Sequence, residues 1–339
     1  MSFPSNRPPA LETDPLSRIA VLERNRTVAL RAARVLRSAS GLASVANEAD
    51  PATLRSMLSE DLQLLACDAS DLDLALEWAQ NRYRDLSVVA WTSGAMDPLL
   101  EAARSSSNLV SLVGWPSFAS MPRPWELALA TRRIVDASAG APRLSELFSW
   151  GSTVMKYRPR TSRDRDVVVA EMSVVAERAG ATQRVAQRVG EVAHEMLMNA
   201  MYDAPVGEDG AQRYAHDRKG DIELDENEQP TFRFAADGVH VALQIVDPFG
   251  RLTRRHVLDG ILRGRAGSEG SSDVLDTSNG GAGLGLYRIY SQSSVMVVDI
   301  APGRYTSVTA FFDLDVNPRD VRSMPVSLHL FDPSAREKP

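Results

Sequence analysis

The sequence predicts an α/β protein in which a parallel sheet wrapped by helices is followed by a second unit of helices and strand pairs. Three observations predict this class. Short apolar runs alternate with helical stretches five times between residues 18 and 137. From Asp164 onward the pattern changes to two helices and then pairs of strands. The length of 339 residues also suits two domains of roughly 150 residues each.

In the first half, every predicted strand is followed by a predicted helix. The strands are expected at residues 18–23, 42–48, 61–67, 86–91 and 109–114, and the helices at 26–40, 50–57, 71–83, 97–105 and 124–137. Asp50 before Pro51 is typical of a helix start, because the carboxylate accepts free amide N–H groups and proline fits the first turn. This alternation favours a parallel sheet whose ligand edge lies at the carboxyl ends of the strands.

A short joint links the two halves of the chain. The segment SAGAP at 138–142 is followed by KYRPRTSRDR at 156–165, which holds five basic residues in ten positions. Two interpretations of the basic stretch are open: a solvated linker or helix start, or a docking strip for an acidic partner protein.

The second half is predicted to contain three helices and two strand pairs. Helices are expected at 166–180, 183–203 and 286–293, and strands at 231–237, 239–247, 294–301 and 306–315. Gly180 suits the end of the first helix, and Thr182 suits the start of the second. The acidic stretch 207–229 is predicted to be a solvated loop. Residues 250–280, helical only at 256–264, are predicted to be a long mobile segment of the kind that often forms a lid.

The composition excludes several classes of protein. A net charge of −6 provides no basic footprint for nucleic acid. No apolar run approaches the roughly 20 residues of a membrane helix, and the proline-rich N-terminus lacks the apolar core of a signal peptide. One cysteine, Cys67, excludes an intramolecular disulfide framework, and five scattered histidines disfavour structural zinc. We therefore expect a cytoplasmic protein with no membrane segment and no direct nucleic-acid partner.

Glu195 and Asn199 are the first candidate site residues. They lie four positions apart on a predicted helix and therefore share one face. A carboxylate and a carboxamide on one face can position a water and Mg²⁺, which prefers oxygen ligands. Two polar residues on a solvated stripe are the alternative interpretation.

Two further segments carry candidate binding residues. An apolar strand ends at Asp247, whose carboxylate can accept a hydrogen bond from an exocyclic amine such as adenine N6, and Gly250 permits close backbone approach. The segment NGGAGLGLYRIY at 279–290 places glycines before an amphipathic helix, where free amides and the helix dipole favour phosphate. A common strand-end turn and a flexible hinge are the respective alternatives. The glycine segment is neither a P-loop nor a good Rossmann fingerprint.

Taken together, these segments resemble the GHKL ATPase domain, the family of histidine kinases, anti-sigma serine kinases, gyrase B, Hsp90 and MutL. The order of motifs over residues 164–316 carries the resemblance: Glu-x-x-x-Asn on a helix, Asp-x-x-Gly at a strand end, a lid, Gly-x-Gly-Leu-Gly-Leu, and Gly-x-x-Thr on a late strand. The resemblance implies a two-layer α/β sandwich, the Bergerat ATP-binding fold. The stretch from Met172 to Ala204 is most similar to the anti-sigma serine kinase subgroup.

The resemblance implies a role for each matching residue. It implies that Glu195 is the catalytic general base or water-orienting residue, that Asn199 is the Mg²⁺ ligand, and that Asp247 reads the adenine. The other implied nucleotide-binding positions are Asp203, Gly250, Gly281, Gly283, Leu284, Gly285 and Thr306. ATP and Mg²⁺ are therefore the implied cofactors.

Departures from the family pattern favour ATP binding over efficient turnover. The strand-end box reads Asp-Pro-Phe-Gly rather than Asp-x-Gly-x-Gly, Tyr202 stands where histidine kinases often carry lysine, and Asp203 adds an acid. No histidine precedes His194, so a phosphorylated histidine on an upstream hairpin is not expected. Three functions are open: ATP-dependent phosphorylation of a partner signalling protein on serine or threonine, a non-catalytic switch in which ATP orders residues 251–280, or a partner-binding scaffold that keeps both folds and binds no ligand.

The first half resembles a response-regulator receiver domain over residues 18–137, which implies a (βα)5 flavodoxin-like fold. Among the functional positions of that family, Thr92 matches. The acidic pair is replaced by Glu23-Arg24, the phosphoacceptor position by Ala66 (with Asp68 two residues beyond), and the lysine by Trp115. We therefore expect a pseudo-receiver that serves regulation or interaction without phosphoryl chemistry.

The predicted organisation has five parts. They are a disordered lead at 1–16, the receiver-like domain at 17–138, a linker at 139–163, the GHKL-type domain at 164–317 and a C-terminal extension at 318–339. Within the extension, residues 324–331 have a β-like pattern that the sequence alone does not explain. Since GHKL proteins often dimerise, the resemblance also leaves a homodimer open.

Overall fold

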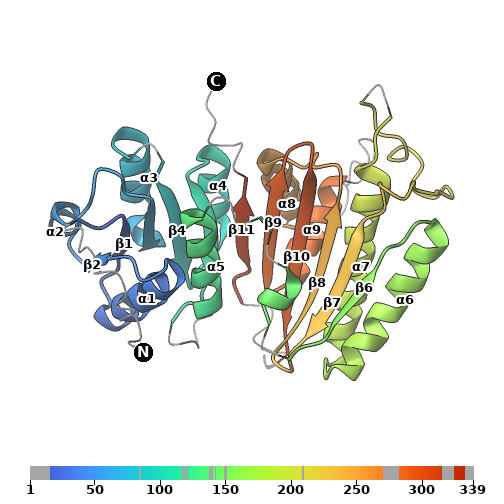
Figure 1. Cartoon of the computed structure of the whole chain (residues 1–339), viewed down its shortest axis with the longest axis horizontal. Helices are drawn as coiled ribbons and strands as arrows, with labels where there is room; N and C mark the ends of the chain where they lie inside the picture. The colour runs from blue at the N-terminus through green and yellow to red at the C-terminus, as the bar shows by residue number, and fades with distance from the viewer. Residues whose placement is uncertain are drawn as a thin grey trace, which may run out of the picture.

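One mixed sheet of eleven strands runs through both halves of the chain (Figure 1), so the protein is α/β as predicted. The computed structural model describes residues 16–332, except residues 84, 117–118, 120, 137–139, 142, 149–150, 208–209, 270–281 and 315–323. The strand order is β2-β1-β3-β4-β5-β11-β9-β10-β8-β7-β6. Apart from Leu16, the predicted disordered lead lies outside the described residues.

The first half contains the five predicted strand–helix units. Its strands are β1 (Ile19–Leu22), β2 (Val45–Glu48), β3 (Leu64–Asp68), β4 (Ser87–Thr92) and β5 (Leu109–Gly114), and its helices are α1 (Arg26–Ala39), α2 (Pro51–Ser56), α3 (Leu72–Asn81), α4 (Asp97–Ser105) and α5 (Pro124–Val135). The five strands pair in parallel. Asp50 caps α2 as expected, because its carboxylate accepts the Thr53 amide at 2.7 Å.

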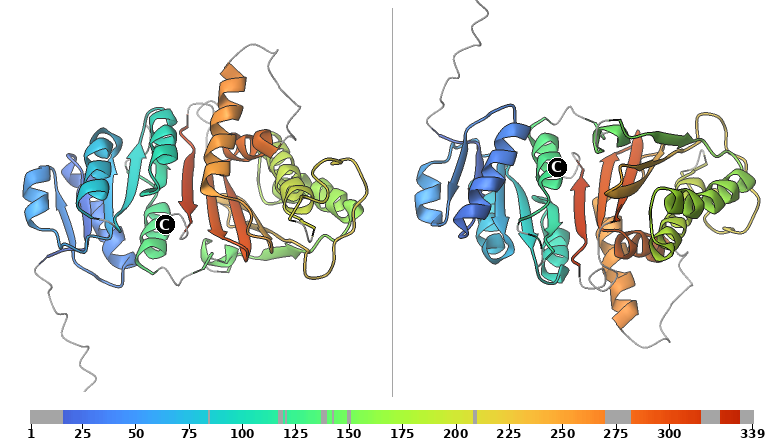
Figure 2. Two further views of the ribbon diagram at one scale, coloured as in Figure 1. Left: turned by 90° about the horizontal axis from the view of Figure 1, so that it is seen from above. Right: turned by 90° about the horizontal axis from the view of Figure 1, so that it is seen from below.

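The second half is an antiparallel sheet with helices packed on one face (Figure 2). Its strands are β6 (Val154–Tyr157), β7 (Thr231–Ala236), β8 (His240–Asp247), β9 (Val295–Ala301) and β10 (Tyr305–Asp313), and its helices are α6 (Ser162–Arg178), α7 (Gln183–Met198), α8 (Arg254–Glu269) and α9 (Ala282–Gln292). Strand β8 pairs with β7 on one side and β10 on the other. Helix α7 packs on β8 and β10, and α9 packs on α7 and β9.

The last strand, β11 (Ser327–Phe331), joins the two halves. It pairs antiparallel with β5 and parallel with β9, and all five of its residues are buried. The Ser327 hydroxyl also accepts a hydrogen bond from the Gly114 amide at 2.8 Å, which links the start of β11 to the end of β5. The segment that the sequence predicts only as an extension is therefore a central strand of the sheet.

Helix α8 corrects the prediction of a long mobile segment at 250–280. Residues 254–269 form a helix, while residues 270–281 lie outside the described part of the chain. Val257, Leu258 and Ile261 are buried against the second half. Gly264 lets α9 cross closely, since a Cβ at this position would lie 2.3 Å from the Tyr287 Cβ. The three glycines and four arginines within residues 254–269 obscure the helical periodicity outside the predicted 256–264 stretch.

Helix α8 also docks on α4 of the first half. The buried Arg254 donates through Nη2 to the carbonyls of Ala103 (2.9 Å), Ser106 (3.2 Å) and Leu109 (2.6 Å). These carbonyls lie at and just beyond the end of α4, where a cation is favoured by the helix dipole. Arg104 on α4 also pairs with a carboxylate of α8 at 2.7 Å. The two halves are therefore linked by helices as well as by β11.

Candidate functional site

A cavity of about 240 Å³ lies between the sheet and the helices of the second half. It is lined by Met196, Asn199, Ala200, Asp203, Ala204, Gln212, Ile245, Asp247, Arg251, Leu252, His256, Arg263, Leu286, Ile289, Thr306 and Val308. Four predicted site residues are among them, and they come from α7 and its continuation, β8 and β10. The structure thus brings together segments that are far apart in the sequence.

A π-helical turn carries the first two of these residues. Helix α7 continues into a five-residue turn over Asn199–Asp203, in which the Ala204 amide donates to the Asn199 carbonyl at 3.0 Å. The sequence predicts an uninterrupted helix to residue 203, so the change of hydrogen-bond pattern corrects that prediction. Such turns are rare and occur frequently at functional sites. Here the turn leaves both Asn199 and Asp203 lining the cavity.

Asp247 lies buried at the end of β8. Its Oδ1 accepts the amides of Phe249 at 2.9 Å and Gly250 at 3.2 Å, so Oδ2 can accept a hydrogen bond from a ligand. Burial raises the Asp247 pKa above the usual range, and the two amide bonds offset part of that rise. Gly250 itself has a φ of +60°, and a Cβ there would lie 2.3 Å from the Ala301 carbonyl oxygen. Gly250 therefore shapes the turn that holds Asp247.

Thr306 faces Asp247 across the β8–β10 pair. The two residues are direct partners in the register of these strands. The buried Thr306 hydroxyl lies close enough to the Asp247 carboxylate to lower the pKa of that acid. Both side chains line the cavity, so a polar ligand atom there would meet the two together.

The residues at the other end of the cavity form a tight cluster with α9. A Cβ placed on Gly285 would lie 2.8 Å from Glu195 Oε2 and 3.2 Å from Asn199 Oδ1. Glu195 is buried, and its Oε1 accepts a hydrogen bond from Arg288 Nη1 at 2.6 Å. Glu195 lines a neighbouring groove between α6 and α7 rather than the cavity itself. The predicted acid, amide and glycine are therefore in direct proximity.

The remaining glycine-segment predictions have different outcomes. Gly283 belongs to the first turn of α9, and Leu284, which is half-buried, does not line the cavity. Gly281 lies outside the described residues. The N-terminal end of α9 nevertheless begins next to Asn199, which is the arrangement that the glycine segment predicts.

Arg218 is a site residue that sequence reasoning missed. It comes from the acidic stretch 207–229 and forms an ion pair with Asp203, and its Nη2 also lies 3.5 Å from Asn199 Oδ1. Burial raises the pKa of Asp203, Arg218 offsets part of that rise, and the Glu195 charge adds to it. The basic pair at 218–219 within an otherwise acidic stretch is the only sequence signal for this contact.

Three basic residues line the cavity besides the predicted site residues. Arg251, His256 and Arg263 all come from the turn after β8 or from α8. Arg251 lies outside any predicted element, and the helical stretch predicted at 256–264 is too short to show which face His256 and Arg263 share. A cavity with a buried carboxylate at one end and several cations around it suits a ligand with an amine and an anionic group.

Tyr202 points away from the cavity. Its hydroxyl accepts a hydrogen bond from Arg165 at 2.8 Å and donates to the Gly220 carbonyl at 3.1 Å. The side chain is buried and holds the start of α6 against the 207–229 stretch. The absence of lysine at this position therefore has no direct effect on the cavity.

The basic stretch 156–165 and the acidic stretch 207–229 contact each other. Arg160 pairs with Glu223 at 2.6 Å, and the Leu224 amide donates to the Arg160 carbonyl at 2.9 Å. Within the described part of this stretch, Asp221, Glu223, Asp225 and Glu226 are exposed, as expected for a solvated loop, and the buried Ile222 and Leu224 anchor it. At these contacts, the basic stretch meets acidic residues of its own chain.

The carboxyl ends of the first-half strands hold acids that are engaged internally. Strand β3 runs to Asp68 rather than ending near Ala66, so Asp68 lies at the strand end, where it caps the following helical turn. Glu23 accepts hydrogen bonds from Trp91 Nε1 at 3.0 Å and from the Asn25 amide at 2.7 Å. Over the whole described chain, no group of three or more His, Cys, Asp and Glu residues is arranged to hold a metal ion.

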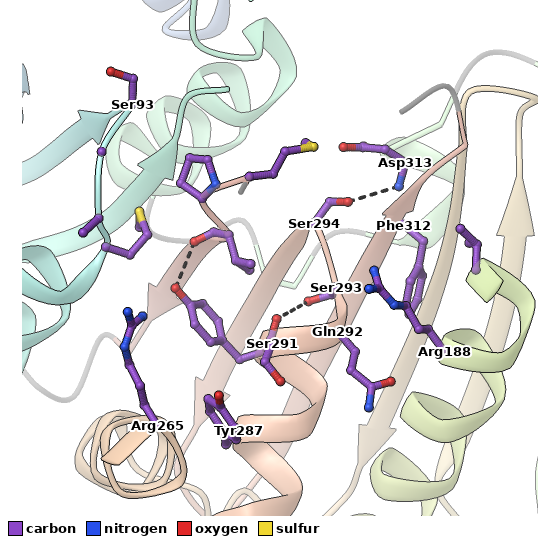
Figure 3. Close-up of a pocket in the computed structure, with 18 residues that line it drawn as sticks. Ser93, Arg188, Arg265, Tyr287, Ser291, Gln292, Ser293, Ser294, Phe312 and Asp313 are labelled. Atoms are coloured by element: carbon purple, nitrogen blue, oxygen red, sulfur yellow. Dashed lines mark hydrogen bonds between the residues drawn. The ribbon is translucent and has the colours of Figure 1, made fainter. Parts of the chain in front are cut away.

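A second hollow, of about 610 Å³, lies where the two halves meet (Figure 3). Arg265, Tyr287 and Ser291 line it from α8 and α9, and Ser93 lines it from the first half. None of the predicted site residues lines this hollow. It therefore stays separate from the site described above.

Comparisons with known proteins provide little further information. No family model matches the sequence, and no curated protein matches it. Among solved structures, the chain is similar to one from the crystal structure of the SiaB-SiaC complex from Pseudomonas aeruginosa, at 17% identity and a TM-score of 0.30, covering 47% of this chain and 88% of that one. This similarity is too weak to support an argument. Within the described residues, no helix has the length and apolarity to cross a membrane.

Proposed function

We propose that the protein binds Mg-ATP in the 240 Å³ cavity and works in signal transduction. One observation carries the proposal: Asn199, Asp247 and Thr306, predicted from separate segments, line the same cavity. A structural role alone gives no reason for these three side chains to converge on an internal space.

The residues around the cavity fit an adenine nucleotide. Asp247 Oδ2 and the Thr306 hydroxyl would hold the adenine end, with apolar contacts from residues such as Ile245 and Leu286. Asn199 would provide an oxygen ligand for Mg²⁺. The N-terminal end of α9, adjacent to Gly285, would hold phosphates through its free amides and dipole. When bound, Mg-ATP supplies a metal-neutralised triphosphate to this site.

A nucleotide-dependent switch is the function that the geometry supports best. Leu252, His256 and Arg263 line the cavity, and α8 is also docked on α4 through Arg254. Ligand contacts on one side of α8 would therefore bias its packing against the first half on the other side. In this proposal the receiver-like half presents the altered surface to a partner signalling protein.

Phosphorylation of that partner on serine or threonine is the second candidate function. Glu195 favours it, because its Oε2 faces Gly285 beside Asn199, where a general base for an incoming hydroxyl would be needed. The Arg288 ion pair holds this carboxylate in place. Replacement of Glu195 by alanine should then abolish transfer to the partner while ATP affinity changes little.

Calorimetry with Mg-ATP tests the proposed site. We expect the unaltered protein to bind, Asn199→Ala to lose at least tenfold in affinity, and His194→Ala to bind normally, because His194 is an exposed residue on the same helix. Absence of binding by the unaltered protein would refute the proposal. Equal affinity of the Asn199 and His194 variants would place the ligand elsewhere.

A further inference from the structure

We infer that Arg218 is the residue that recognises the phosphate chain, so that this site discriminates nucleotides by their number of phosphates. The inference rests on the proposed function and deepens it. The relevant contacts are the Arg218–Asp203 ion pair and the approach of Arg218 Nη2 to Asn199 Oδ1 at 3.5 Å. They place a guanidinium at the same end of the cavity as Gly285 and the start of α9.

The charges at this end of the cavity require such a cation. Asp203 and Glu195 are two acids close enough for the charge of Glu195 to raise the Asp203 pKa. Their charges would repel a triphosphate unless each is balanced. Arg288 balances Glu195 and Arg218 balances Asp203. The family departure at Asp203 is therefore compensated by an arginine from a different segment.

The segment that carries Arg218 is anchored independently of the cavity. Tyr202 donates to the Gly220 carbonyl at 3.1 Å, and the Ser162 hydroxyl accepts the Ile222 amide at 2.8 Å. These contacts fix the backbone on the C-terminal side of Arg218, while its side chain is about one-quarter exposed (24%). The guanidinium can therefore turn from Asn199 Oδ1 toward a bound anion while it stays paired with Asp203.

Guanidinium chemistry suits this role. Its planar fork of donors makes bidentate, charge-assisted hydrogen bonds to phosphate oxygens, and it retains its charge at every physiological pH. A cation beside Asn199 Oδ1 would also compete with Mg²⁺ for that oxygen. Metal and phosphates arriving together would favour movement of Arg218 from the carboxamide to the phosphate chain.

The test compares the affinities of Mg-ATP, Mg-ADP and adenosine by calorimetry for the unaltered protein, Arg218→Ala and Arg218→Lys. We expect Arg218→Ala to lower Mg-ATP affinity about 10- to 100-fold and to leave adenosine affinity unchanged. Lysine should restore part of the loss, because it keeps the charge without the fork. Arg213→Ala is the matched control, since Arg213 belongs to the same segment but pairs with Glu228.

The outcomes separate this inference from the proposed function. Unchanged Mg-ATP affinity in Arg218→Ala would overturn the inference while leaving ATP binding intact. An equal loss of ATP and adenosine affinity would also overturn it, because it would indicate that Arg218 only supports the fold of the segment. Absence of nucleotide binding by the unaltered protein would overturn both proposals.

Discussion

Gly285 lies so close to Asn199 that a methyl group on its Cα would be 3.2 Å from the carboxamide oxygen. The same methyl group would be 2.8 Å from Glu195 Oε2. Contacts of this length are closer than Cβ atoms normally make, so the glycine is required for the present packing of α9 against α7. The candidate Mg²⁺ ligand, the candidate base and the candidate phosphate-binding helix therefore share one contact point.

Gly285→Ala should weaken nucleotide binding without unfolding the protein. The new Cβ displaces Glu195 or Asn199, whereas alanine adds about 1 kcal/mol of helix propensity that offsets the strain. We expect about a tenfold loss of Mg-ATP affinity by calorimetry and a change in unfolding free energy below about 1 kcal/mol. Gly267→Ala is the control, because nothing in the described part of the chain lies within 4 Å of a Cβ there. Unchanged affinity in Gly285→Ala would mean that α9 does not border the nucleotide.

Asp247→Asn should bind ATP less well and yet be more stable than the unaltered protein at neutral pH. Asparagine Oδ1 can still accept the amides of Phe249 and Gly250, but its amide group presents a donor to the adenine amine. We expect Mg-ATP affinity to fall about 10- to 100-fold.

The stability of this variant should depend on pH with a definite sign. Because burial raises the Asp247 pKa, the folded state holds this proton after the unfolded chain has lost it. The unaltered protein therefore loses stability as pH rises from the ordinary Asp pKa of about 4 through the raised folded pKa. Denaturant titrations at several pH values should show Asp247→Asn gaining relative stability over that window and constant relative stability above it. If Asp247→Asn instead gained stability relative to the unaltered protein as the pH fell, the burial of the Asp247 carboxyl would be contradicted.

Several residues around this cavity could be singled out from the sequence because each motif is local. Glu195 and Asn199 share a helix face, and Asp247 ends an apolar strand, so their elements could be assigned from periodicity. Arg218 and the basic residues of α8 could not be found in this way. They lie in segments whose glycine, arginine and acidic residues obscure any period, and their positions depend on contacts with distant parts of the chain.

In the fold, too, some elements can be predicted from neighbouring residues, whereas others depend on contacts with distant parts of the chain. The five β-α units of the first half are each specified by a short apolar run and an adjacent amphipathic stretch. Strand β11 is different, because only pairing with β5 and β9 gives residues 327–331 their place in the sheet. This five-residue run has too little sequence to identify β5, which lies 213 positions earlier at the Gly114–Ser327 contact, as its partner. The continuity of the sheet across both halves therefore required the structure.

Arg254→Ala should loosen the contact between α8 and α4. The substitution removes a buried cation and leaves the carbonyls of Ala103, Ser106 and Leu109 without that donor, at a cost of about 3 kcal/mol in unfolding free energy. Arg255→Ala should cost less than about 0.5 kcal/mol, because Arg255 is largely exposed. Denaturant unfolding measures both. If both substitutions changed the unfolding free energy by a similar small amount, α8 would not depend on its contact with α4. The proposed switch would then have no contact through which α8 could affect the first half.

Gly114→Ala should detach β11 and expose two edges of the sheet. A Cβ at Gly114 would lie 2.3 Å from the Pro325 carbonyl oxygen, and this backbone atom cannot move without displacing the start of β11. Overpacking of this kind costs about 1–3 kcal/mol. Loss of the strand would also leave β5 and β9 with unpaired backbone groups, which promote association between chains.

We therefore expect Gly114→Ala to unfold at lower denaturant concentration and to form oligomers in size-exclusion chromatography. Gly94→Ala is the matched control, since its Cβ would meet Thr92 Oγ1 at an ordinary 3.5 Å. Because β11 holds β9 beside β5, and β9 pairs with the strand that carries Thr306, detachment should also weaken Mg-ATP binding. A monomeric Gly114→Ala protein with unaltered stability would show that β11 contributes little to holding the two halves of the sheet together. Oligomers with full ATP affinity would show instead that the second half keeps its site without the first.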